Sequence, residues 1–250
     1  VILSGKIGQL DLPPGKSKSV TINLGGIRPD SGTEYFLTVR ARTNRELPLL
    51  RKGHVVAWEQ FDLYLEKDEK TRSIPDDPLP VISETDKGIK VVGEKFSVFF
   101  DRESGHINHF SFNDREIISD PINDHFWRAP NDNDLGNGMP KRTAIWRTAH
   151  NSLRTDQMTA EVKQKFVQVN ILKSFDDLSF EINSTFKVFG NGRVDVIHHY
   201  SISDSSLPEI PRIGIKMSFS GDYKNVTWFG RGPHESYVDR KTSASIDLYS

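Results

Sequence analysis

Residues 180–202 read FEINSTFKVFGNGRVDVIHHYSI, and this stretch decides the fold class. On both sides of Asn191-Gly192, apolar and polar side chains alternate with period two, which is typical of β-strands that bury one face. Asparagine and glycine both tolerate positive φ, so the dipeptide predicts a tight hairpin. The stretch therefore predicts two antiparallel strands joined by a short turn.

The same alternation recurs along most of the chain. It places the apolar residues of 35–41 on one face of a strand, and it does the same for 213–219. No segment has a convincing helical stripe beyond a turn or two near 141–148. Further strands are predicted at 19–24, 54–64, 88–92, 95–101, 106–112, 161–174 and 225–229. The sequence therefore predicts an all-β protein.

Composition narrows the class of function. The 250 residues hold 33 basic and 34 acidic side chains, a formal net charge of −1, which gives no electrostatic argument for nucleic acid or an anionic membrane. No apolar run approaches the roughly 20 residues of a membrane span. The chain has no cysteine, which excludes disulfides and thiolate metal sites and leaves cytoplasm and periplasm both open as compartments.

One segment indicates a domain boundary. Residues 66–80, EKDEKTRSIPDDPLP, are charged and then proline-rich without apolar periodicity, so we predict an extended linker over 69–80. The linker separates a small β-sandwich at 1–68 from a larger β domain at 81–250. The first part is shorter than the about 100 residues of an immunoglobulin-like domain, so we expect it to lack its first strands.

The polar stretch WRAPNDNDLGNG at 127–138 is the first candidate site. A calcium loop beginning at Asp132 needs glycine at its sixth position and a carboxylate at its twelfth, but Asn137 and Thr143 stand there. A tight turn, in which the asparagine and aspartate side chains bond their own backbone, is the simpler interpretation.

A second interpretation of the same stretch is a surface that faces a sugar. Indole and guanidinium side chains stand on both sides of it, at Trp127, Arg128, Trp146 and Arg147. Pyranose rings pack on flat aromatic groups, and sugar hydroxyls bind short polar side chains. Both interpretations remain open from the residues alone.

The second candidate site is WFGRGPHESYVDR at 228–240. His234 or Glu235 could act as a general acid or base. The alternative is a structural corner in which arginines pair with carboxylates and the glycines and Pro233 set the turn. We favour the corner, because the sequence supplies neither a nucleophile nor partner geometry.

These motifs together resemble the small-chain region of family 2 β-galactosidases. The resemblance is carried by FWRAPNDNDLGNG at 126–138, by Trp146, and by GRGPHESYVDR at 230–240, and it extends over nearly the whole chain. Val238 stands where a proline is usual. The residues that match the second signature of the family are Gly232, Pro233, Glu235, Tyr237, Asp239 and Arg240.

The resemblance implies a fold and a location for the chemistry. It implies an immunoglobulin-like sandwich followed by a large antiparallel β-sandwich, similar to the galactose-mutarotase supersandwich and incomplete at its C-terminus. Retaining cleavage needs two carboxyl groups about 5 Å apart, and in this family both are glutamates of a TIM barrel. This sequence has no alternation of strands and helices. It therefore contains no catalytic residue, and the isolated chain is expected to be inactive.

The resemblance also implies what the chain contributes. It implies part of an enzyme that hydrolyses terminal non-reducing β-D-galactose residues in β-D-galactosides, with no cofactor or metal ligand in this chain and with divalent or sodium ions held by barrel residues. The residues expected to line the substrate mouth are Arg128, Asn131, Asp132, Asn133, Asp134 and Gly136, with Gly136 as a hinge.

The partners implied are the galactoside and the other domains of the same polypeptide, with room for a homo-oligomer. Two other functions stay open. One is a non-catalytic module for carbohydrate binding or assembly. The other is a different activity on the same architecture, such as that of a glucuronidase or a mannosidase.

Overall fold

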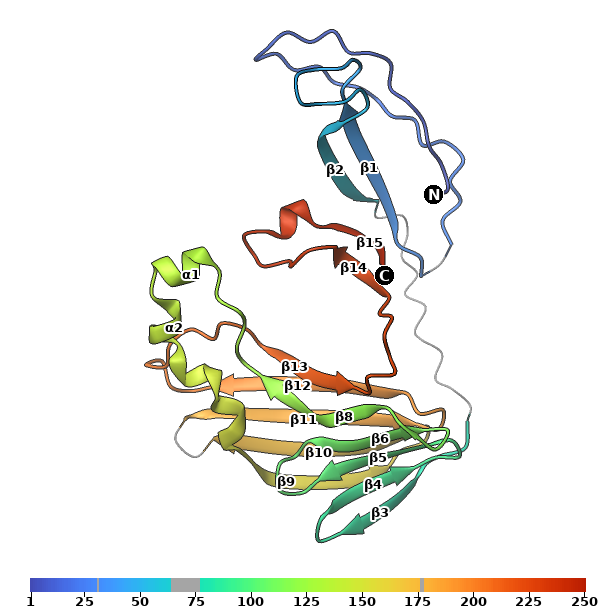
Figure 1. Cartoon of the computed structure of the whole chain (residues 1–250). Helices are drawn as coiled ribbons and strands as arrows, with labels where there is room; N and C mark the ends of the chain where they lie inside the picture. The colour runs from blue at the N-terminus through green and yellow to red at the C-terminus, as the bar shows by residue number, and fades with distance from the viewer. Residues whose placement is uncertain (31, 64–76, 176–177) are drawn as a thin grey trace. The chain divides into compact units, whose positions relative to one another are not determined.

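The computed structural model describes residues 1–30, 32–63, 77–175 and 178–250, and antiparallel strands dominate them (Figure 1). The all-β expectation is confirmed. The described residues divide into two compact units, Val1–Ser73 with Arg231–Ser245, and Ile74–Gly230 with Ile246–Ser250. Among them, no helix has both the length and the apolar character that crossing a membrane requires.

In the first unit, β1 (Tyr35–Arg42) pairs with β2 (Val55–Leu63). The phenolic oxygen of Tyr35, which is buried, accepts a hydrogen bond from the backbone N–H of Asp30 at 2.9 Å. The strand predicted at 19–24 is wrong, because these described residues join no ladder. The immunoglobulin-like sandwich at 1–68 stays a prediction, and most of the predicted linker at 69–80 lies outside the described residues.

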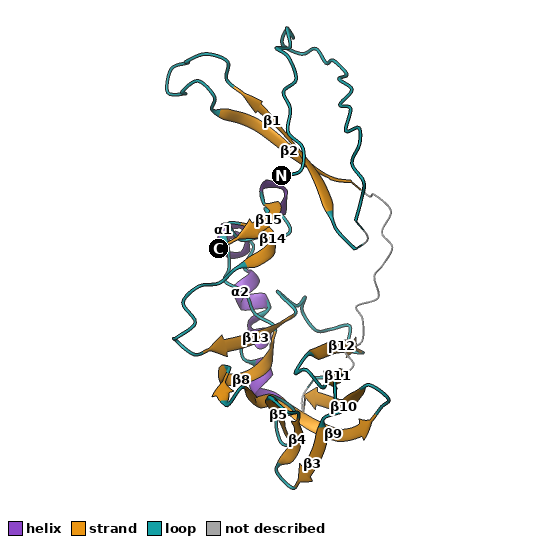
Figure 2. Ribbon diagram, turned by 90° about the vertical axis from the view of Figure 1, so that its right-hand side faces the viewer, coloured by secondary structure: helices purple, strands orange, loops and turns teal. Residues whose placement is uncertain are grey.

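The second unit contains two sheets, which we call sheet A and sheet B. Sheet A has the order β12-β11-β10-β9, and sheet B has the order β13-β8-β6-β5-β4-β3, with β7 paired to β6. Figure 2 shows the two sheets as separate layers. The strands of sheet A are β9 (Leu153–Val162), β10 (Phe166–Phe175), β11 (Phe180–Phe189) and β12 (Val194–Ile202). The strands of sheet B are β3 (Val81–Thr85), β4 (Gly88–Val92), β5 (Phe96–Asp101), β6 (Ile107–Phe112), β7 (Arg115–Glu116), β8 (Ile118–His125) and β13 (Gly214–Phe219).

The remaining elements are short. Between β8 and β9 the chain forms α1 (Asp132–Gly136), α2 (Met139–Arg142) and the 3-10 turns η1 (Ala144–Arg147) and η2 (Ala149–Ser152). Near the C-terminus, β14 (Trp228–Gly232) pairs with β15 (Ser245–Tyr249), and the 3-10 turn η3 (Lys241–Ser243) lies between them.

The hairpin predicted from residues 180–202 forms as expected. β11 and β12 pair from Phe180↔Ile202 to Val188↔Val194, and Gly192 in the turn has a φ of 87°. The alternate residues of β11 that face sheet B are buried, and the edge of the Phe186 ring meets Phe100 of sheet B with their centroids 5.0 Å apart. The core therefore lies between the two sheets.

The strand predicted over 161–174 is wrong in its extent. The chain turns back at 163–165, where the N–H of Lys163 donates to the carbonyl oxygen of Phe166 at 2.9 Å, and so β9 and β10 are separate antiparallel strands. The turn consists of lysine and glutamine, without glycine or proline to mark it. β8 was also missed, because Pro121 lies within it and proline argues against a strand.

The alternating face of 213–219 forms as predicted but is not covered. Ile213, Ile215, Met217 and Phe219 are 50%, 37%, 52% and 51% exposed. β13 is an edge strand of sheet B. Alternation determines which side chains share a face, whereas burial depends on a second layer over that face.

A buried ion pair joins the two sheets through their core. Nζ of Lys173 in β10 contacts Oδ2 of Asp124 in β8, and the two side chains are 3% and 2% exposed. In the same interior, the hydroxyl of Ser184 hydrogen-bonds Nδ1 of His198 at 2.7 Å. Burial, together with the charge of Asp124, raises the pKa of Tyr200 to about 12. A polar layer therefore interrupts the apolar core.

Removing one partner of this pair should destabilise the fold more than removing both. Lys173→Met leaves a buried carboxylate without its counter-ion, which costs about 3–5 kcal/mol, whereas an apolar pair of similar volume is often neutral. We expect the double variant Lys173→Met/Asp124→Leu to recover most of the loss in urea unfolding. A double variant as unstable as the single one would contradict the interpretation.

Acid should weaken the fold through its partly buried histidines, of which His106 has the largest shift. Burial, together with the charge of Lys173, lowers the pKa of His106 from 6.5 to about 4. Between pH 6.5 and 4 the His106 imidazole is mostly protonated in the unfolded chain and mostly neutral in the folded chain. The free energy of unfolding therefore decreases as the pH falls from 7.5 toward 4. His106 alone should account for about 2 kcal/mol at pH 5. Unfolding at both pH values checks this, and His106→Gln should reduce the difference.

Candidate functional site

The polar stretch at 131–136 forms a short helix, not only a turn. The side chain of Asn131 caps α1 by accepting from the N–H of Asp134 at 2.9 Å, and the N–H of Asn131 donates to Oδ2 of Asp134 at 2.9 Å. This reciprocal capping box satisfies backbone donors that the helix itself leaves open. The predicted bonds from these side chains to their own backbone are present, and they start a helix.

Arg128 binds Asp134 and thereby holds this cap in place. Its guanidinium donates to both carboxylate oxygens of Asp134, through Nη2 to Oδ1 at 2.7 Å and through Nη1 to Oδ2. The hydrogen bond from Arg128 holds the pKa of Asp134 below its ordinary value. Because the pair is bidentate and Asp134 is buried, the orientation of the cap is strongly determined.

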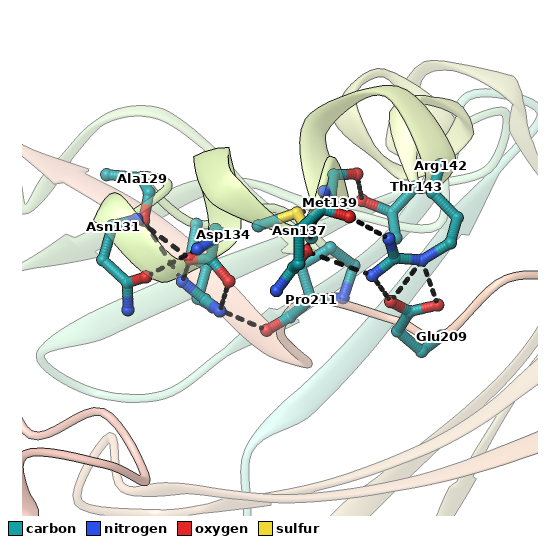
Figure 3. A network of polar contacts seen from close by, with 10 residues as sticks. Ala129, Asn131, Asp134, Asn137, Met139, Arg142, Thr143, Glu209 and Pro211 are labelled. Carbon is teal, nitrogen blue, oxygen red and sulfur yellow. Dashed lines mark hydrogen bonds and ion pairs between the residues drawn. The ribbon is translucent and has the colours of Figure 1, made fainter.

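The segment 208–211 accepts hydrogen bonds from residues of the connection between β8 and β9. Nε of Arg128 donates to the carbonyl oxygen of Pro211 at 3.2 Å, and the indole N–H of Trp146 donates to that of Pro208 at 3.0 Å. Nε of Arg142 donates to Glu209 at 2.9 Å, and its Nη1 donates to the carbonyl oxygen of Asn137 at 2.9 Å. Figure 3 shows Asp134 beside Asn131, and Arg142 beside Glu209 and Asn137.

Trp146 does not face solvent. It is fully buried and packs with Phe126, at 6.0 Å between ring centroids, and with Phe180. The expectation of two indoles on a sugar-facing surface is therefore wrong for Trp146. Trp127 is half-buried, and the guanidinium carbon of Arg147 lies 5.9 Å from the centroid of its ring.

The two glycines of the loop have different roles. Gly138 has a φ of 75° and caps α2, so its backbone requires the conformational freedom of glycine. Gly136 ends α1 without positive φ, and apart from its chain neighbours and its own helix backbone, a methyl group added there would meet no described atom within 4 Å. The hinge role of Gly136 stays a prediction.

The candidate residues divide into anchored and exposed ones. Arg128, Asn131 and Asp134 are brought together in the cap. Asp132 and Asn133 are exposed, and their side chains make no hydrogen bond within the described part of the chain. The exposed pair can hydrogen-bond a polar ligand, while the anchored residues hold the helix that presents them.

The carboxylates held by arginines here are poor proton donors. The Arg142 side chain lowers the pKa of Glu209, as Arg128 does for Asp134. A glycosidic acid catalyst needs a raised pKa. Among the described residues, no group of three or more histidine, aspartate or glutamate side chains could hold a metal ion.

The second motif forms a hydrogen-bonded corner between β14 and β15. Glu235 pairs with Arg240, and Arg231 donates to the carbonyl oxygens of Lys241 at 3.0 Å and Ala244 at 2.9 Å. Nε2 of His234 lies 3.1 Å from the hydroxyl of Ser243. Of the other signature residues, Gly232 is buried and precedes Pro233 through a cis peptide bond, Tyr237 accepts from the N–H of Arg240 at 2.8 Å through its carbonyl, and Asp239 is exposed.

Sequence reasoning missed the segment 208–211. Two of its contributions to the loop are backbone carbonyl oxygens, which every residue carries, so no side-chain pattern marks them. The signal available was indirect. Arg128, Arg142 and Trp146 are donors close to one another in sequence, and a buried donor, such as the indole N–H of Trp146, needs an acceptor from elsewhere in the chain.

Comparison with known proteins agrees with this architecture. The family described as beta galactosidase small chain matches residues 92–250, and the family described as beta-galactosidase, domain 4, matches residues 1–64. The chain is 27% identical to a β-galactosidase of Priestia megaterium, over 96% of this chain and 23% of that protein.

Two further relatives agree. A β-galactosidase of Vibrio cholerae is 27% identical over 96% of this chain and 24% of its own length. One of Pseudoalteromonas haloplanktis is 29% identical over 88% of this chain and 23% of its own length. The chain thus spans about a quarter of the length of the curated relatives that it matches. With 92–250 matched, the chain belongs to the beta galactosidase small-chain family.

Proposed function

We propose that this chain acts as part of a retaining β-galactosidase, which hydrolyses terminal non-reducing β-D-galactose residues in β-D-galactosides. In this proposal the chain supplies no catalytic group. Its loop at 128–136 forms part of the wall of the substrate mouth, and the two glutamates that cleave the bond come from another segment of the polypeptide.

The observation that carries the proposal is the bidentate pair of Arg128 and Asp134. The pair closes the capping box of α1, and Arg128 also bonds the carbonyl oxygen of Pro211 at 3.2 Å. A wall of a binding site must be held in one position, because small displacements around a substrate are costly in rate. The exposed side chains of Asp132 and Asn133 are hydrogen-bonding groups of the kind that sugar hydroxyls bind.

The electrostatics of the loop support a framing role over an acid–base role. Arg128 lowers the pKa of Asp134, so that carboxylate stays ionised and cannot donate the proton that a leaving sugar oxygen requires. We therefore place the acid/base and the nucleophile outside this chain. We also propose that any divalent or sodium ion of the complete enzyme is held by residues outside it.

The 250-residue chain alone should not turn over substrate. With 2-nitrophenyl β-D-galactoside at a concentration that saturates the complete enzyme, we expect release of nitrophenol no faster than in buffer. Circular dichroism of the same sample should show β structure, so that inactivity is not unfolding. Turnover by this chain at a rate comparable to that of the complete enzyme would sink the proposal.

Loosening the cap should reduce activity in the complete enzyme. Asp134→Asn replaces a charge-assisted bidentate contact with weaker neutral bonds, a loss of about 1–2 kcal/mol. If that energy positions the loop during catalysis, kcat/KM should fall by roughly tenfold. Steady-state kinetics on the same galactoside measures the change.

A matched control exists in sheet A. Arg193 donates to Asp195 through two nitrogens, at 2.8 and 2.6 Å, so Asp195→Asn removes the same kind of pair away from the loop. We expect Asp195→Asn to leave kcat/KM within about twofold of the parent. Equal kinetics for both variants would remove the loop from the substrate mouth while leaving the family assignment untouched.

A further inference from the structure

A cluster of four basic side chains lies where β8 ends beside β13, and the contacts that anchor the loop use none of them. The members, which we call the cationic cluster, are His125, His150, Arg212 and Lys216. His125 is the last residue of β8 and pairs with Gly214, the first residue of β13. Both histidines are half-buried, whereas the arginine and the lysine are exposed.

The guanidinium of Arg212 lies across from His125. Residues opposite one another on paired strands project from the same face of the sheet, with their Cβ atoms about 5 Å apart. Gly214 has no side chain to place there, and a Cβ built on it would lie 3.0 Å from Nε and 3.2 Å from Nη2 of Arg212. The guanidinium therefore takes the position of the missing side chain, on the face from which His125 projects.

Lys216 and His150 complete the cluster. Lys216 follows Gly214 by two residues without a change of register, so it shares the face of His125 as a diagonal neighbour, with about 7–8 Å between them. The ring of His150, which comes from η2, lies 5.8 Å from that of His125 between centroids, at an interplanar angle of 41°. Basic groups from three places in the chain therefore converge at the end of β8.

The positive charge of the cluster has no acidic partner within the described part of the chain. There, the side chains of Arg212 and Lys216 make neither an ion pair nor a hydrogen bond. The two carboxylates of β8 are placed elsewhere. Asp124 projects into the core and meets its buried lysine partner, and Asp120 lies beyond Lys216 along the pairing with β13.

The electrostatics agree with this arrangement. Burial, together with the charges of the three other members of the cluster, lowers the pKa of His125, and the carbonyl oxygen of Trp127 acts in the opposite direction. Burial and the charge of Lys216 lower the pKa of His150, whose own charge acts on His106 in turn. Both rings of the cluster are therefore neutral at pH 7, and a bound anion would favour their charged forms.

The composition of the cluster suits an anion better than a metal ion. Two imidazoles can bind a transition metal, but two fixed positive charges in the same group disfavour any cation. Guanidinium and ammonium groups bind sulfate and phosphate oxygens, and each imidazole can add an N–H donor. The Nδ1 atoms of His125 and His150 are buried without a hydrogen-bond partner among the described residues, so Nε2 is the nitrogen that a ligand can reach.

We propose that the cationic cluster binds one small tetrahedral oxyanion, either a free sulfate or phosphate ion or its ester. Arg212 donates through its guanidinium, Lys216 through its ammonium group, and the two imidazoles donate through Nε2 when they are protonated. The site performs no chemistry and does not depend on the proposed role of the loop. Because its two fixed charges are exposed to water, the expected dissociation constant is about a millimolar.

The test is a titration of the 250-residue chain with sodium sulfate, at an ionic strength held constant with sodium chloride. Sulfate stays a dianion from pH 6 to pH 8, so only the protein titrates. In NMR spectra of the histidine rings we expect saturable shifts of His125 and His150, with a dissociation constant of about a millimolar at pH 6. The constant should be at least about threefold larger at pH 8, where the imidazoles stay neutral. Circular dichroism at each pH checks the fold.

Single substitutions in the cluster should weaken the binding of sulfate. Arg212→Gln and Lys216→Gln should each raise the dissociation constant by about fivefold or more, because each removes a charged donor. Lys90→Gln is the matched control, since Lys90 is an exposed lysine in the middle of β4 and its loss changes the net charge by the same amount. We expect that variant to bind sulfate as the parent does.

Galactose 6-sulfate distinguishes the two sources of the same chemistry. Equal or weaker binding of the ester assigns the free ion, and tighter binding assigns the ester. The proposal is overturned if neither ligand gives saturable shifts, or if both cluster variants bind like the parent. It is also overturned if Lys90→Gln loses as much affinity as they do, or if Zn²⁺ saturates the two imidazoles while sulfate does not.

Discussion

The contact between Lys173 and Asp124 is the constraint around which the second unit is arranged. The two side chains come from different sheets and are almost fully buried, so each charge depends on the other for compensation. The pair forms only when its two partners meet, so it favours the alignment of β10 with β8 that the structure shows. Because β8 leads directly into Phe126 and Arg128, the alignment of the sheets also sets where the loop begins.

From that starting point the loop is held by its own capping box and by contacts of arginine and tryptophan. Arg128 and Arg142 each engage a carboxylate and a backbone carbonyl, and Trp146 engages a carbonyl while filling the core. The arginines keep their carboxylate partners ionised. The same contacts that stiffen the loop therefore make it unsuited to proton transfer, which is the physical reason for assigning it a framing role.

Much of the fold follows from the sequence, because period-two alternation depends only on neighbouring residues. Strands such as 88–92 and 106–112 were predicted closely, and so was the hairpin at Asn191-Gly192. The turn at 163–165 was not, since its lysines and glutamine carry no turn signal. In the candidate site, the short-range bonds of Asn131 and Asp134 were predictable. The anchors on 208–211 were not, because they join residues more than 60 positions apart.

The use of carbonyl oxygens by Pro208 and Pro211 bears on how this surface tolerates change. A backbone oxygen persists whatever side chain the residue carries, so the receiving half of each contact is insensitive to point substitution as long as the chain follows the same path. The donor half of each contact is different, because only a guanidinium or an indole supplies an N–H group that far from the backbone. Mutational sensitivity should thus be one-sided for these two contacts, high at Arg128 and Trp146 and low at Pro208 and Pro211.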